Sequence, residues 1–149
     1  QAKTLFPYTT LFRSCCRPAT WSAISAISTP VIAKDLVFIP DFSGLFHCID
    51  AKTGADVYRE RVIEGSGGGG GGRRGGGKPF YASPVLIGDK LVCVSRKNGA
   101  YILAAKPKYE LIGHNVLSLD GSQFNGTPAV SGDQLLLRSD KAVYCIGVK

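Results

Sequence analysis

Apolar and polar residues alternate along this chain in short stretches that are separated by turn residues. Alternation with a period of two is typical of β-strands, and no stretch shows the sustained 3.6-residue apolar period of a helix. The pattern predicts almost no helix and three groups of strands. The predicted ranges are 28–33, 36–40, 44–50 and 56–62; 80–87, 90–95, 100–105 and 109–116; and 123–131, 134–139 and 142–148.

The three groups are copies of one repeat, which begins where a hydroxyl residue precedes a proline. The phrase reads STPV at 28–31, ASPV at 82–85 and GTPA at 126–129, and an aliphatic strand and then an aromatic one follow each copy. The prolines lie 54 and 44 residues apart, and a glycine-rich insert in the first interval accounts for the excess. A period of about 40–45 residues built from short strands is typical of a β-propeller blade.

The sequence therefore predicts an all-β fold, a partial β-propeller of about three blades. Each blade is expected to be a four-stranded antiparallel sheet, and the last to have four or three strands. We expect the repeats over residues 25–149, with blades at about 25–64, 79–118 and 122–149 and a flexible loop at 65–78. A propeller closes with about 4–8 blades, so we expect a fragment of a larger protein whose remaining blades cover the open faces.

The first 24 residues are expected to be non-native or unstructured. Residues 4–14 resemble, letter for letter, one reading frame of a widely used short-read sequencing adapter. Scars of this kind are excluded from fold reasoning. Everything up to about Ala23 is therefore discounted in predicting the fold.

The turns between the predicted strands have explicit chemistry. Lys34-Asp35 and its counterparts at 88–89 and 132–133 occupy the same position in each repeat, and Ser43-Gly44 and Asn98-Gly99 mark the next hairpin. Glycine and asparagine tolerate the positive φ that tight hairpins require.

The stretch from Ile49 to Tyr58, IDAKTGADVY, resembles the A-L-D-A-x-T-G-x-x-x-W signature of PQQ-like propeller repeats, a family named after pyrroloquinoline quinone. Asp50 and Thr53 are expected to hydrogen-bond the turn backbone, and Gly54 to permit the reversal. Tyr58 stands where the family has tryptophan, a ring that packs between blades. The resemblance covers residues 25–149, and the chain ends like the C-terminus of such proteins.

The net charge of +7 lies mostly outside the repeats. Six basic residues fall in the N-terminal segment and the glycine-rich insert, and without them about +1 remains; they are Lys3, Arg13, Arg17, Arg73, Arg74 and Lys78. This distribution argues against nucleic acid as a partner. No stretch approaches the about 18 apolar residues of a membrane-spanning helix.

Cysteine and histidine do not occur with the spacing of a metal site or a disulfide framework. Cys48 and Cys145 occupy the repeat position that Ile102 holds in the middle copy, which indicates buried packing for both thiols. His47 and His114 are interpreted as structural. The adjacent pair Cys15-Cys16 resembles the vicinal disulfide of quinone-dependent alcohol dehydrogenases, but its place before the repeats favours a chimeric junction.

The glycine-rich insert holds two further resemblances. Residues 72–79 differ from a phosphate-binding loop because Pro79 replaces the hydroxyl residue and a strand follows instead of a helix. A single Arg-Gly-Gly is weak evidence for RNA binding. A flexible loop is the favoured interpretation.

Two functions are weighed. The favoured one is a non-enzymatic scaffold that presents propeller loops to protein partners; it resembles the PQQ-like repeat proteins of bacterial envelopes, including the lipoprotein that assists outer-membrane protein assembly. This implies a periplasmic or secreted protein. The alternative is a fragment of a PQQ-dependent alcohol dehydrogenase, whose quinone lies at the ring centre beside a carboxylate-bound Ca²⁺.

The position of the acidic residues favours the scaffold. They fall almost entirely at turns, where they serve hydrogen bonding; examples are Asp35, Asp89, Asp120 and Asp133. We therefore assign no catalytic, cofactor-binding or metal-binding residue, and we expect no cofactor and no enzymatic activity.

Overall fold

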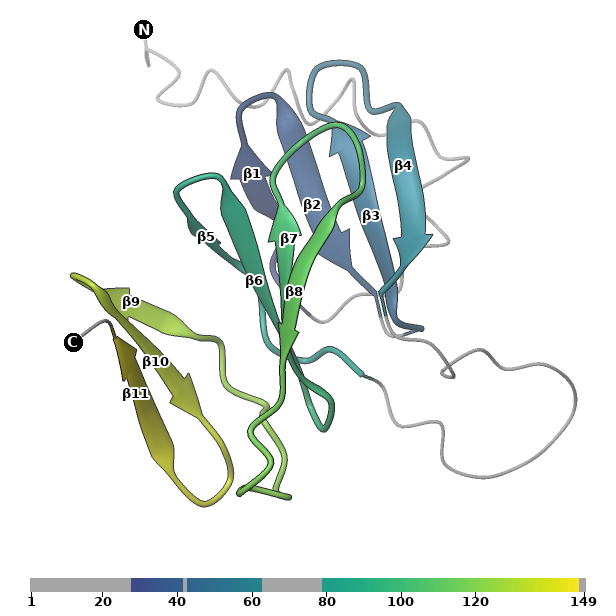
Figure 1. The fold of residues 1–149 in the computed structure, drawn as a ribbon. Coiled ribbons are helices and arrows are strands. Elements are labelled where there is room, and N and C mark those ends of the chain that lie inside the picture. The colour runs from purple at the N-terminus through teal and green to yellow at the C-terminus, as the bar shows by residue number, and fades with distance from the viewer. Residues whose placement is uncertain (1–27, 42, 63–78, 148–149) are drawn as a thin grey trace, which may run out of the picture.

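The computed structural model describes residues 28–41, 43–62 and 79–147, which form eleven strands and no helix (Figure 1). The N-terminal segment 1–24, Cys15-Cys16 and the glycine-rich loop 65–78 lie outside the described residues. No helix in the described ranges is long and apolar enough to cross a membrane. The strands are β1 (Val31–Ala33), β2 (Leu36–Pro40), β3 (Leu45–Asp50), β4 (Asp56–Arg61), β5 (Val85–Ile87), β6 (Lys90–Ser95), β7 (Gly99–Ala104), β8 (Leu111–Asn115), β9 (Ala129–Ser131), β10 (Gln134–Arg138) and β11 (Val143–Gly147).

The strands form three antiparallel meanders, in which each strand pairs with the next along the chain. Blade 1 contains β1–β4, blade 2 contains β5–β8, and blade 3 contains β9–β11. Figure 1 shows the three sheets in chain order, with blade 2 between the other two. The predicted fold class, a partial β-propeller with three blades, is confirmed, and the last blade has three strands in the described residues.

The predicted strands are found in order, but the first strand of each blade begins later than predicted. The predicted starts were 28, 80 and 123, whereas the observed strands begin at Val31, Val85 and Ala129. Each of these residues directly follows the repeat proline. Proline has no N–H to donate to a ladder, so the continuous strand starts after it. Before Pro84, Phe80 forms only an isolated antiparallel bridge with Ser95.

The hydroxyl residue before each proline connects one blade to the next. The N–H of Thr29 donates to the Oγ of Ser83 at 2.8 Å, and the N–H of Ser83 donates to the Oγ1 of Thr127 at 3.1 Å. The same bond is therefore made twice between successive blades. This explains physically why serine or threonine recurs at this position.

Blades 1 and 2 enclose the larger hydrophobic core. Phe38, Phe46 and Cys48 of blade 1 belong to one buried cluster with Leu91 and Leu103 of blade 2. Burying a large apolar side chain contributes about 1.5–3 kcal/mol. Burial also raises the pKa of the Cys48 thiol to about 11, which keeps this thiol neutral.

Blades 2 and 3 share a second, thinner core. Val92, Val94 and Ala100 of blade 2 pack with Phe124 and Leu137, which are buried on the other side. Two of its further members from blade 3, Leu135 and Tyr144, are only partly buried. The second core thus has fewer buried members than the first.

The prediction of a buried thiol holds for Cys48 and is wrong for Cys145. The register confirms their equivalence, since Cys48 pairs with Phe38, Ile102 with Val92, and Cys145 with Leu136. However, Cys145 is exposed. It lies on the face of blade 3 that points away from blade 2, and no described blade packs on that face.

Positive φ occurs at the predicted turn positions. The first turn of each blade has Lys34 at 56°, Gly88 at 60° and Gly132 at 56°. In the next hairpin, Gly99 has a φ of 83°, and a Cβ on it would lie 2.1 Å from the carbonyl oxygen of Asn115. Glycine is therefore required there for conformation and for space.

Candidate functional site

The Asp-Ala-Lys-Thr-Gly turn of blade 1 is a closed hydrogen-bonded unit. The Oδ1 of Asp50 accepts bonds from the N–H of Lys52 at 2.9 Å and from the N–H and hydroxyl of Thr53 at 2.7 and 2.9 Å. These bonds, those of Thr53 above all, lower the pKa of Asp50. Gly54 supplies a φ of 71°. The roles expected for Asp50, Thr53 and Gly54 are confirmed. The Asp50 carboxylate forms its hydrogen bonds within its own turn.

The first strands of the three blades, β1, β5 and β9, are the inner strands, and they carry no acidic side chain. Residues 31–33, 85–87 and 129–131 read VIA, VLI and AVS. Within the ranges that the structure describes, no group of three or more His, Cys, Asp or Glu could hold a metal ion. The inner edge of these blades therefore offers aliphatic surface instead of ligands.

His47 belongs to a buried polar pair that the sequence did not reveal. Its Nε2 lies 3.2 Å from the Oδ2 of Asp41, and both side chains are almost fully buried. Burial alone would raise the pKa of Asp41, but hydrogen bonds from Ser43, Leu45 and His47 together hold it below its ordinary value. The available signal was the Asp-x-Ser spacing before the hairpin glycine, which is typical of an Asx-turn.

His114 is also a structural residue of its sheet. Its ring stacks on Tyr101 with centroids 4.2 Å apart, and its Nε2 contacts the carbonyl oxygen of Asn98. Both histidines are therefore held by polar contacts within their own blades, as interpreted from the sequence.

Arg96 organises the polar contacts between blades 2 and 3. Its Nε donates to the Oδ1 of Asn125 at 2.9 Å, and its guanidinium also bonds Gln123. The same group lies 4.3 Å from the centre of the Tyr81 ring, a cation–π arrangement. The carbonyl oxygen of Arg96 accepts the N–H of Phe124 at 3.0 Å. This residue fixes the connection between the two blades.

Asp120 makes further polar contacts, which join the segment before blade 3 to β11. Its Oδ1 accepts the N–H of Ser122 at 2.8 Å, and its Oδ2 accepts the hydroxyl of Tyr144 at 2.7 Å. Bonds from Ser122, Ser139 and Tyr144 hold the pKa of Asp120 well below its usual range. This carboxylate forms a turn before the last blade, as predicted, and its oxygens are occupied.

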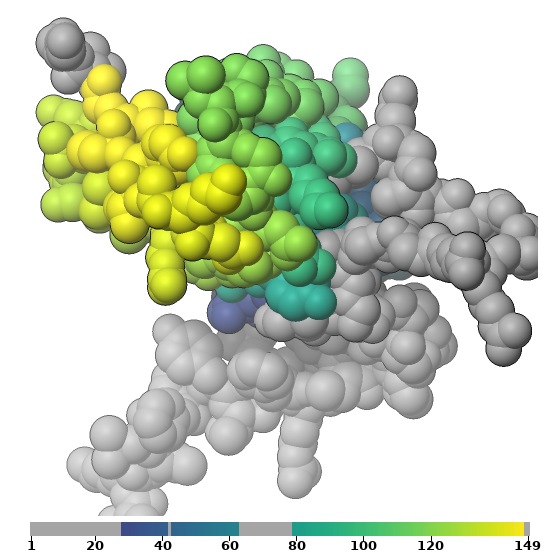
Figure 2. Space-filling view, turned by 90° about the horizontal axis from the view of Figure 1, so that it is seen from below, coloured from purple at the N-terminus to yellow at the C-terminus, as the bar shows by residue number. Residues whose placement is uncertain are grey.

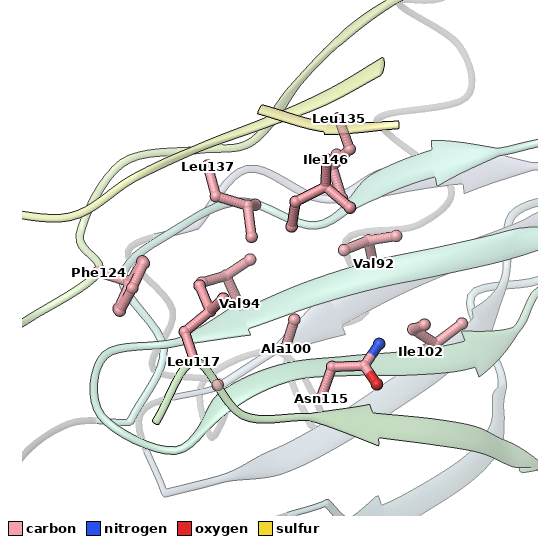
Figure 3. A pocket seen from close by; sticks show the side chains of 11 residues that line it. Val92, Val94, Ala100, Ile102, Asn115, Leu117, Phe124, Leu135, Leu137 and Ile146 are labelled. Atoms are coloured by element: carbon pink, nitrogen blue, oxygen red, sulfur yellow. The ribbon is translucent and has the colours of Figure 1, made fainter. Parts of the chain in front are cut away.

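An apolar cleft of about 210 Å³ lies between blades 2 and 3. Figure 3 shows side chains from the two sheets pointing toward one another across it, with Asn115 as the one polar side chain labelled. The lining residues are Val92, Val94, Gly99, Ala100, Ile102, Asn115, Leu117, Phe124, Leu135, Leu137 and Ile146. This lining has no nucleophile and no acid, so the cleft is suited to hold an apolar group.

One ring of the first interface has no counterpart in the second. Tyr58 pairs with Cys48, and its ring packs edge-on against Tyr109 with centroids 5.9 Å apart, as the expected interblade wedge. In blade 2 the equivalent residue is Gly113, which pairs with Ile102. A Cβ added to Gly113 would meet no atom within 4 Å. The second interface therefore has open space at the position of the tyrosine.

No protein-family model and no curated protein sequence matches this chain. Solved structures do match. BamB from Moraxella catarrhalis is similar with a TM-score of 0.62 and 16% identity, over 84% of this chain and 34% of that chain. Quinohemoprotein alcohol dehydrogenase from Comamonas testosteroni is similar with a TM-score of 0.55 and 14% identity, over 76% of this chain and 17% of that chain.

The chain thus spans about a third of one neighbour and about a sixth of the other. At these identities the similarity concerns the fold, and it agrees with the repeats and the sheet topology. The fold of this chain is a β-propeller fold, of which the described residues form three consecutive blades.

Proposed function

We propose that this chain is a non-enzymatic β-propeller scaffold that presents loops to protein partners, as part of a larger repeat protein. The main support for this proposal is that three carboxylates form hydrogen bonds within their own turns. Asp41, Asp50 and Asp120 are each held by hydrogen bonds within their own turns, and the inner strands are aliphatic. A scaffold needs turns of this kind, because firmly held turns present the same surface to each partner.

The polar contacts between blades support this role. The Ser/Thr bonds at the inner edge and the Arg96 contacts fix one blade relative to the next. Loops carried by such a rigid support are the usual location of binding residues. Protein partners that contact these loops, and the remaining blades of the parent chain, are the proposed interactions.

The proposed location is the periplasm or cell envelope of a bacterium. Support comes from the resemblance to PQQ-like envelope repeats and from the structural similarity to BamB. In this proposal residues 25–149 form the repeat domain and residues 1–24 are foreign to it. Sequencing an independent clone tests the latter, and residues 4–14 are expected to be absent from it.

A fragment of a PQQ-dependent alcohol dehydrogenase is the second candidate, favoured by the similarity to the Comamonas testosteroni enzyme. That chemistry needs a quinone enclosed at the ring centre and a Ca²⁺ ion held by carboxylates. The inner strands of the described blades supply Val, Ile, Leu, Ala and Ser. These residues do not fit the group, which supports the scaffold over the enzyme.

Titration with pyrroloquinoline quinone and Ca²⁺ tests this choice. Fluorescence binding and light scattering are recorded together, with a known quinoprotein apoenzyme as the positive control. We expect no saturable binding and no dehydrogenase activity. Saturable micromolar binding by a monodisperse monomer would overturn the scaffold proposal.

A further inference from the structure

We propose that the cleft between blades 2 and 3 binds a small neutral phenol, which is a single aromatic ring with one hydroxyl group. The cleft has a volume of about 210 Å³, and Asn115 is the one polar side chain among the residues that line it. A cavity of about 150 Å³ that is lined by Leu, Ile and Phe stays dry and binds benzene. The cleft is therefore large enough and apolar enough for one ring.

The open space arises because an alanine stands where blade 1 has a phenylalanine. Cys48 and Ile102 are equivalent in the register, and two residues earlier on the same strands lie Phe46 and Ala100. The ring of Phe46 is fully buried in the first interface and stacks on Phe38 with centroids 6.0 Å apart. Ala100 lines the cleft with a methyl group alone. The second interface therefore lacks one phenyl group at this position.

Phe124 does not compensate for the missing ring. It has its own counterpart in the first interface, Phe80, because the two residues lie at the same distance before Val85 and Ala129, where the first strands of blades 2 and 3 begin. Phe80 is buried in the same cluster as Phe46. The first interface thus holds both rings, and the second holds one ring and the cleft.

Polar contacts keep blades 2 and 3 at their present spacing. On blade 2, Arg96 bonds Asn125, and its carbonyl oxygen accepts the N–H of Phe124. On blade 3, the hydroxyl of Tyr144 donates to Asp120 at 2.7 Å. Figure 2 shows this end of the molecule, where blade 3 in yellow lies directly against the green segment that precedes it. Moving the blades together to close the cleft would disturb these bonds.

Asn115 selects the polar group of the ligand. It pairs with Ala100, so the two side chains lie on the same face of the sheet, and Figure 3 shows the amide of Asn115 beside Ala100. A primary amide offers both a donor and an acceptor, so a hydroxyl group on a ring above Ala100 can bond to it. The lining carries no charged side chain, which favours a neutral ligand.

Fluorine NMR of 4-fluorophenol, added to the full chain, tests the site. Fluorobenzene is the matched probe without the hydroxyl group. We expect saturable changes for both signals, with about fivefold weaker binding of fluorobenzene because one hydrogen bond is lost. Methyl signals of labelled valine and leucine locate the probe, and their shifts should be confined to cleft residues such as Val94, Leu117 and Leu137.

Three variants separate the ring site from the polar contact. Ala100→Phe restores the ring that blade 1 has at this position, so we expect at least about tenfold weaker binding of both probes. Ala129→Phe is the matched control, because Ala129 is exposed and does not line the cleft, and its affinities should equal those of the unchanged chain. Asn115→Leu should bind 4-fluorophenol only as tightly as fluorobenzene.

The absence of saturable binding by 4-fluorophenol would overturn the proposal, as would methyl shifts outside the cleft. Equal affinities of Ala100→Phe and Ala129→Phe would overturn the ring site, and a phenol preference that persists in Asn115→Leu would overturn the polar contact. Circular dichroism checks the folding of each variant. If Ala100→Phe does not fold, Ala100→Leu fills part of the same space and should also weaken both probes relative to Ala129→Leu.

Discussion

The hydroxyl groups of Ser83 and Thr127, which each precede a repeat proline, join one blade to the next. Their oxygens accept N–H groups from the preceding repeat, those of Thr29 and Ser83. At the residue scale, the recurring Ser/Thr-Pro sequence therefore marks the position of an interblade hydrogen bond. Tyr58 and Gly113 show the opposite case, in which one exchanged residue distinguishes a filled interface from an open one.

Replacing Ser83 by alanine should destabilise the protein by about 1 kcal/mol, because the N–H of Thr29 loses its acceptor. Ser131→Ala on the exposed strand β9 is the control and should change the free energy of unfolding by less than about 0.5 kcal/mol. Urea unfolding measures both. Equal effects of the two changes would contradict the interblade role.

The Asp41–His47 pair makes the free energy of unfolding depend on pH. The pKa of Asp41 is lower in the folded state than its ordinary value of 3.8, so its contribution is complete above that value and is lost as pH falls through the folded pKa. Asp41→Asn should cost about 1–3 kcal/mol at pH 7 and should reduce the difference in Tm between pH 7 and pH 2. An unchanged difference would show that Asp41 does not carry this pH dependence.

At the element scale, the strands and turns were predictable because their signals are local. The alternation of apolar and polar residues predicted the order of the strands, and the positions of glycine and asparagine predicted the hairpins. The strand starts were predicted too early because proline cannot donate a hydrogen bond to a ladder. The Arg96 contacts were not predictable, since Gln123 and Asn125 lie 27 and 29 residues away without a motif. Cys145 was misjudged because equivalence in a repeat does not tell whether a neighbouring blade is present.

Gly88 and Gly99 distinguish two reasons why a turn requires glycine, namely a positive φ and a lack of space for a Cβ. Both have positive φ, but only at Gly99 would a Cβ collide with backbone. Gly88→Ala should cost about 1 kcal/mol for the left-handed conformation. Gly99→Ala should cost about 3 kcal/mol or more, because strain and collision act together. Denaturant midpoints of the two variants test this, and similar values would contradict the predicted collision.

At the scale of the whole molecule, the blades differ in how completely they are covered. The first interface fully buries Phe38, Phe46, Leu91 and Leu103, and the second contains the cleft. The outer face of blade 3 leaves Val143 and Cys145 exposed. In a repeat array each unit is stabilised by its neighbours. Blade 3 is therefore expected to open most readily, with the coverage of its outer face left to further blades.

Thiol labelling tests this gradient. Cys145 should react with N-ethylmaleimide in the native state, whereas the buried Cys48 and Cys93 should react only after unfolding, since burial raises the pKa of both thiols. A background with Cys15→Ser and Cys16→Ser limits the readout to these three residues. Mass mapping of the labelled peptides gives the result, and native labelling of Cys48 as fast as Cys145 would contradict the packing described.

The central claim is that the repeats form successive blades packed face to face. The most direct measurement is the nuclear Overhauser effect between the rings of Tyr58 and Tyr109, which belong to different blades and have centroids 5.9 Å apart. Selective labelling of tyrosine, with Tyr58→Leu to assign the signals, isolates this contact. The structure predicts a clear cross-peak between the two rings that disappears in the variant. Absence of the cross-peak in a folded sample would contradict the propeller arrangement.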